Sequence, residues 1–227
     1  MKSLTLICSS CVQSWSDVAM FGYCTDEGLS ASREHIMEQV TEVIKERVTA
    51  RGFTGVSSST VELNTEMRIK TAKETIVKAC LVFGHAILVG TVIDLLKLTC
   101  ELSLNVWKPR LHETKITVGD IEKYGYEKCL TKLAEHEIYN LRGTSAKVQR
   151  LLEIVKPERE WNVRNLTNIC GRIGDLTRKR DDIAHGRKPT KPADTDDVDF
   201  LRSANYYLCE ITAKRYGENI VFAGKKG

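Results

Sequence analysis

The sequence predicts an all-α fold, a helical bundle forming one large domain or a smaller domain with an extension. Apolar residues recur at helical spacing in successive segments, which Pro and Gly residues separate. No strand–helix alternation and no internal repeat is visible along the 227 residues. The length is sufficient for a core without disulfides, and the 28% of charged residues and four prolines argue against a disordered chain.

The first sixty residues contain one clear helix signal. Ser30 or Ser32 is expected to cap this helix and Gly52 to follow its end. Its apolar positions are Ile36, Val40, Val43, Ile44 and Val48. Residues 54–60, TGVSSST, are typical of a linker. We therefore expect residues 1–60 to form an N-terminal helical extension of unknown role and residues 61–227 to form the main helical domain.

The segment from Met67 to Trp107 predicts a long helix or a broken pair of helices, ended by Pro109. Its longest apolar run, Ala79 to Ile93, is shorter than the roughly 18 to 20 residues that a bilayer-spanning helix needs. We therefore predict a buried central helix with His85 as a core histidine, and no membrane partner. A membrane helix is the alternative interpretation.

The remainder of the chain predicts four more helices. They are expected at 126–141, 144–155, 163–184 and from Thr195 onward. Residues 112–117 are rich enough in β-branched side chains to predict an extended segment. Gly119 and Gly125 indicate irregular connections, and residues 186–192, GRKPTKP, separate the last two helices.

The eight cysteines do not predict a disulfide framework, because this is not a short secreted chain. Most lie singly in apolar or helical segments, which indicates small buried thiols in a reduced, cytoplasmic protein. Cys8 and Cys11 have the spacing of a metal-binding pair, and Cys24 could supply a third ligand. No histidine lies near them and a second pair is missing, so plain thiols are the preferred interpretation and no metal or cofactor is expected.

Residues 178–188, RKRDDIAHGRK, end a predicted helix, where Gly186 can take the left-handed position that follows a helix. Asp181 and His185 are four residues apart, so they share a face on which a carboxylate could orient the imidazole. Arg180 lies five residues before His185, about 140° around an ideal helix. One helix therefore does not direct both side chains at one atom, whereas a second copy of the chain could bring two Arg/His pairs to one groove.

These residue types suit cleavage of RNA by its own 2′-hydroxyl group. A base takes the 2′-hydroxyl proton, an acid protonates the leaving 5′-oxygen, and a cation stabilises the charge on phosphorus. His185 could act as base or acid and Arg180 could bind the phosphate, without a metal. RNA-binding charge would come from the cations around them, namely Arg178, Lys179, Arg187 and Lys188.

This segment resembles the HEPN superfamily, whose signature is an Arg, four to six residues and then a His, closing the penultimate core helix. Here the Arg is Arg180, the polar residue after it is Asp181, and His185 lies in the Ala-His-Gly ending seen in many bacterial members. The resemblance is specific only over about the last 80 residues of the chain. It implies a helical bundle and a metal-independent endoribonuclease that acts as a homodimer, often as a toxin or antiviral-defence effector. Some members pair with an antitoxin that modifies a Tyr two residues after the His; Arg187 stands there, so that control is not expected.

Two alternatives remain open for this motif. It could belong to a non-catalytic HEPN-like module that binds RNA, a nucleotide or a protein, or it could be only a helix-end ion pair with His185 stabilised by the helix dipole. The charge distribution favours RNA. Residues 178–191 contain six basic and two acidic residues, so this window equals the net charge of +4 of the whole chain.

Overall fold

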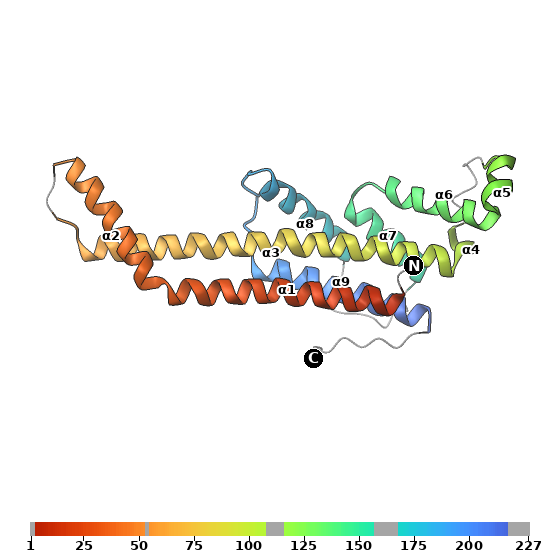
Figure 1. Ribbon diagram of the computed structural model, residues 1–227, viewed down its shortest axis with the longest axis horizontal. Helices are drawn as coiled ribbons and strands as arrows, with labels where there is room; N and C mark the ends of the chain where they lie inside the picture. Colours follow the sequence, from red (N-terminus) through yellow and green to blue (C-terminus); the bar gives the residue numbers. More distant parts are fainter. Residues whose placement is uncertain (1–2, 53–54, 108–115, 157–167, 218–227) are drawn as a thin grey trace.

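A computed structural model describes residues 3–52, 55–107, 116–156 and 168–217. These residues form helices and no strand, which confirms the predicted all-α class. Figure 1 shows an elongated molecule built along one long helix, α3. The bounds are α1 Leu4–Ala31, α2 Arg33–Ala50, α3 Ser58–Leu102, α4 Leu104–Trp107, α5 Val118–Tyr124, α6 Tyr126–Asn140, α7 Gly143–Val155, α8 Ile169–Ala184 and α9 Thr195–Arg215.

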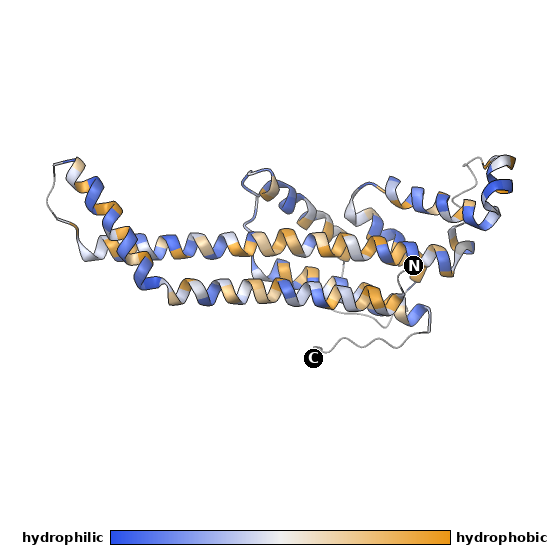
Figure 2. Cartoon of the chain, in the orientation of Figure 1, coloured by the Kyte–Doolittle hydropathy of each residue, from blue (hydrophilic) through white to orange (hydrophobic). Residues whose placement is uncertain are grey.

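Helix α3 is the centre of the bundle, because it packs against α1, α2, α6, α7, α8 and α9. In Figure 1, α1 and α9 lie along one side of α3 and α7 and α8 along the other, while α2 crosses its N-terminal end. Its buried residues concentrate between Cys80 and Cys100, and Figure 2 shows this half of the helix to be mostly apolar. The predicted central helix is therefore present. It begins at Ser58 rather than Met67, so part of the predicted linker is helical.

The length and composition of α3 would also allow it to cross a membrane. In its most apolar 18-residue window, 39% is buried inside the protein. Core helices of soluble proteins have the same character, so this property does not by itself indicate a membrane.

Helix α1 was not predicted, and it contributes a large part of the core. Its buried side chains recur every three or four residues, at Leu4, Ile7, Cys8, Cys11, Trp15 and Val18. They join the hydrophobic core formed with α3 and α9. Residues 4–18 therefore share the core of the domain predicted for residues 61–227. The predicted helix after Ser32 is present as α2, with one fully buried side chain, Val40.

Three of the later helices begin close to where the sequence pattern predicts. α6, α7 and α9 begin within one residue of the predicted positions. Gly119 lies inside α5 rather than in a connection, because Thr117 and Asp120 form a capping box that starts a helix there. Residues 112–115 of the predicted extended segment, and residues 163–167 of the predicted helix 163–184, lie outside the described residues.

Two glycines of α3 provide a direct test of this packing. A Cβ on Gly84 would lie 2.6 Å from Cη2 of Trp15, a ring that is buried, whereas a Cβ on Gly90 would meet nothing within 4 Å. We expect Gly84→Ala to lower the free energy of unfolding by about 1–3 kcal/mol, because the ring must move. We expect Gly90→Ala to raise it by about 1 kcal/mol through helix propensity. Urea denaturation followed by circular dichroism measures both changes in the free energy of unfolding. Equal effects of the two variants would contradict the close packing of the Trp15 ring against Gly84.

Candidate functional site

The motif is held on α8 by a well-defined start and a buried apolar stripe. The side chain of Asn168 accepts a hydrogen bond from Gly171 N at 3.2 Å and caps the helix. Ile169, Ile173 and Leu176 are buried on the face that packs against α3 and α7. This stripe fixes which side chains at the other end of α8 face the bundle and which face solvent.

The C-terminal end of α8 has the geometry predicted for it. His185 is the C-cap residue, and Gly186 follows with φ +67°, the left-handed conformation that favours glycine. The amide of Gly186 donates to Ile183 O at 3.0 Å and that of Arg187 to Asp182 O at 2.7 Å. These bonds close the helix and leave the His185 side chain exposed to solvent.

The proposed catalytic residues do not form one contact group within a single chain. Arg180 Nη1 lies 3.1 Å from Asp181 Oδ1, and the side chain of Arg180 is only 32% exposed. Within the part of the chain that the structure describes, no hydrogen bond or ion pair joins the side chains of Asp181 and His185. Asp181 thus orients Arg180 here, whereas the sequence pattern predicted that it would orient His185.

The four cations predicted to bind RNA have different surroundings. Arg178 pairs with Asp175, and Arg187 Nε lies 3.1 Å from Asp182 Oδ1; both arginines are largely exposed. Lys188 is exposed as well. Lys179 is only 13% exposed, with its ammonium bound to Asp197 and, at 3.0 Å, to the carbonyl of Pro192. The ammonium of Lys179 therefore stabilises the junction between α8 and α9.

These ion pairs reduce the local excess of positive charge. The carboxylates of Asp175 and Asp197, outside the window 178–191, pair with Arg178 and Lys179. Counting them halves the net +4 of the window to +2. Arg180 and Arg187 pair with Asp181 and Asp182 inside the window, so the net +2 that remains for a phosphate backbone lies after the helix, at Lys188 and Lys191.

His85 on α3 lies beside this motif, which the sequence did not predict. It is 1% exposed, and its Nε2 lies 2.9 Å from Oγ1 of Thr177 on α8 and 3.4 Å from Oγ1 of Thr144 on α7. Burial, and next the positive charge of Arg180, lower the pKa of His85 to about 4, with Asp181 acting in the opposite direction. The prediction of a core histidine with satisfied hydrogen bonds is confirmed. Its contact with Thr177 spans 92 residues, so no local pattern could have indicated it.

The cysteine pair considered as a metal site lies inside the core. Cys8 and Cys11 are buried on α1, whereas Cys24 is exposed and about 20 Å further along the same helix. The thiol near them is Cys209 of α9. Its hydrogen bond lowers the pKa of Cys11, while the pKa of Cys209 is raised by its hydrogen bonds with Cys11 and Cys8. No group of three His, Cys, Asp or Glu side chains among the described residues is placed to hold a metal ion.

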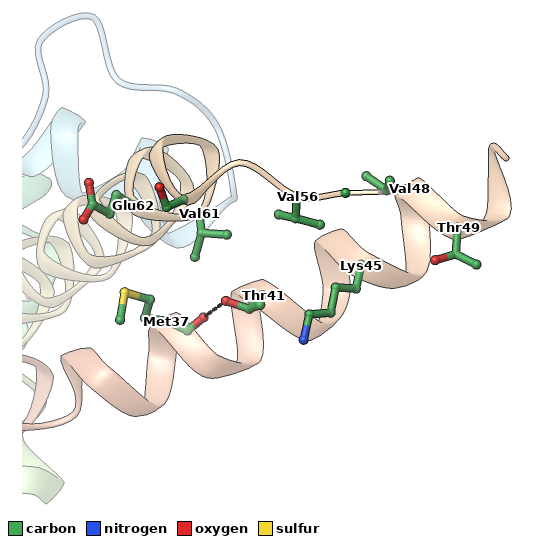
Figure 3. Close-up of a pocket in the computed structure, with 10 residues that line it drawn as sticks. Met37, Thr41, Lys45, Val48, Thr49, Val56, Val61 and Glu62 are labelled. Carbon is green, nitrogen blue, oxygen red and sulfur yellow. Dashed lines mark hydrogen bonds between the residues drawn. The ribbon is translucent and has the colours of Figure 1, made fainter. Parts of the chain in front are cut away.

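Two cavities lie outside the motif. One, of about 690 Å³, opens between α2 and the start of α3, and Figure 3 shows Met37, Val56 and Val61 around it. The other, of about 230 Å³, lies between α1, α3 and the start of α9. None of the residues that line them belongs to the motif of α8.

Comparison with protein-family models, with curated proteins and with solved structures found no match to this chain.

Proposed function

We propose that this protein is a HEPN-type endoribonuclease that cleaves RNA by 2′-hydroxyl attack without a metal ion. The observation that carries the proposal is the end of α8, where Arg180 lies within the helix, His185 directly precedes a left-handed glycine, and basic residues follow. The all-α bundle and the further helix α9 after the motif agree with the architecture that the HEPN resemblance implies.

The chemistry assigns a role to each residue. His185, exposed at the helix end, takes the proton of the 2′-hydroxyl or delivers one to the leaving 5′-oxygen. The 2′-oxygen attacks phosphorus while the bond to the 5′-oxygen breaks, which leaves a 2′,3′-cyclic phosphate and a 5′-hydroxyl. Arg180 binds the phosphate and stabilises its developing charge, and Asp181, at 3.1 Å from it, holds the guanidinium. Arg178, Arg187 and Lys188 bind neighbouring phosphates.

A second copy of the chain completes the site in this proposal. The side chain of Arg180 is partly buried, near enough to His85 of α3 for its charge to act on that ring, while His185 lies in solvent at the helix end. Because their directions differ by about 140° on the helix, Arg180 of one subunit and His185 of the other would flank the same phosphate. A cytoplasmic role in toxin–antitoxin or antiviral defence, with an antitoxin or defence partner, belongs to the same proposal.

The test is cleavage of single-stranded RNA in EDTA by the wild type, Arg180→Ala and His185→Ala. We expect 2′,3′-cyclic phosphate products from the wild type and none from either variant. Mixing the two inactive variants should restore roughly a quarter of the wild-type activity, since mixed dimers contain one intact composite site. Cleavage by His185→Ala at the wild-type rate, or no cleavage by the wild type, would refute the assignment.

A non-catalytic RNA-, nucleotide- or protein-binding module is the second candidate. The ion pair of Asp181 with Arg180, rather than a contact with His185, is the observation that favours it. It predicts salt-dependent RNA binding without product, unchanged in His185→Ala.

A further inference from the structure

The polar contacts of His85 define which of its nitrogens carries the proton. Thr177 has one hydroxyl proton, and its Oγ1 donates to the carbonyl of Ile173 at 2.8 Å. At 2.9 Å from His85 Nε2 the same oxygen must therefore accept. Nε2 of His85 therefore donates and carries a proton, and burial of the ring, which lowers its pKa to about 4, leaves Nδ1 unprotonated and the imidazole neutral at pH 7.

This hydrogen bond joins the central helix to α8 at a defined point. Thr177 lies three residues before Arg180, so the two residues are neighbours on one face of α8. Arg180 and Asp181 are near enough for their charges to act on His85. Arg180 Nε is buried and has no hydrogen-bond partner among the described residues. The guanidinium is therefore held on one side by Asp181 and otherwise by its packing at this place.

We propose that His85 is a positioning residue for Arg180, which it fixes through the Nε2 hydrogen bond to Thr177 and through its own neutral, buried ring. The inference rests on the proposed function, because the task of Arg180 is phosphate binding. A neutral ring at this place holds α8 in register on α3 without adding a second positive charge beside the guanidinium. His85 itself is buried and does not touch RNA.

The experiment compares His85→Phe with His85→Gln. Phenylalanine fills the space and removes the donor, whereas the amide nitrogen of glutamine can reach the position of Nε2. We expect His85→Phe to lower kcat for RNA cleavage by roughly tenfold or more with little change in KM, and His85→Gln to stay near the wild type. Equal kcat values for all three proteins, a change confined to KM, or an equal loss in both variants would overturn the proposal.

The NMR resonance of the Arg180 Nε–H group gives a readout that does not need catalysis. It should move in His85→Phe and remain in place in His85→Gln; an unmoved resonance in His85→Phe would overturn the positioning role. If the wild type cleaves no RNA, the proposed function fails while this measurement still decides the position of Arg180.

A second variant covers the case in which His85→Phe does not fold. Thr177→Val keeps the shape of the side chain and removes the acceptor of His85, so it should lower kcat in the same direction. Thr71→Val is the matched control, because Thr71 is an exposed threonine of α3 that also donates to a helix carbonyl, Met67 O, at 2.9 Å. Equal kcat values for the two variants would overturn the proposal.

Discussion

A Lys179→Met variant should lose about 3 kcal/mol of the free energy of unfolding, because it leaves the carboxylate of Asp197 buried without its cation. The two side chains are only 13% and 11% exposed, so water cannot replace the lost partner well. The same ammonium also binds the carbonyl of Pro192, and thus holds the end of the connection between α8 and α9. Urea denaturation at neutral pH measures the loss.

Two further variants separate this ion pair from a general charge effect. Arg178→Met removes the neighbouring cation, whose ion pair with Asp175 is exposed, and should cost less than about 1 kcal/mol. The double variant Lys179→Met/Asp197→Asn should lie within about 1 kcal/mol of the wild type, since an amide oxygen can still accept from Asp194 N. If Lys179→Met costs no more than Arg178→Met, the ammonium is available to RNA, as the sequence pattern predicted.

Local rules account for the parts of the fold that the sequence predicted well. Gly186 takes the left-handed position because the end of α8 needs a residue without a Cβ there. The start of α9 follows from Asp194 and Asp197, whose side chains and amides form a capping box close to the predicted acidic start. Both features depend on residues within one helical turn, so the sequence alone contains the information.

The contacts that the sequence could not predict join distant segments. Cys8 and Cys11 have the three-residue spacing of a metal pair, which is also the spacing of a helix face, and only the partners on α3 and α9 show which applies. Lys179 was predicted to bind RNA because it lies in a basic run, but its partner Asp197 is 18 residues further along the chain. The same holds for His85, whose contact on α8 depends on how α3 and α8 pack.

Acid should destabilise this protein through His85. Its folded-state pKa of about 4 lies below the ordinary 6.5, so between these values the unfolded chain binds a proton that the folded chain does not. Stability is therefore fully present above pH 6.5 and is lost as the pH falls toward 4. The difference corresponds to about 3 kcal/mol between pH 7 and pH 4. Burial of the ring is the largest cause of the lowered pKa of His85. The positive charge of Arg180 lowers this pKa further, and the negative charge of Asp181 raises it.

The comparison of the wild type with His85→Gln isolates this contribution from the carboxylates that titrate in the same range. Glutamine does not titrate, so the free energy of unfolding of the wild type should fall relative to that of His85→Gln as the pH is lowered. His136→Gln is the control, because His136 is exposed and hydrogen-bonds only to Asn140 of its own helix among the described residues, at 3.0 Å. This control measures the effect of losing an exposed imidazole, and the curve of His85→Gln is compared with it. Parallel curves for the wild type and His85→Gln would mean that the folded protein binds this proton as readily as the unfolded chain, and hence that Arg180 has a second positive charge beside it below about pH 6.5.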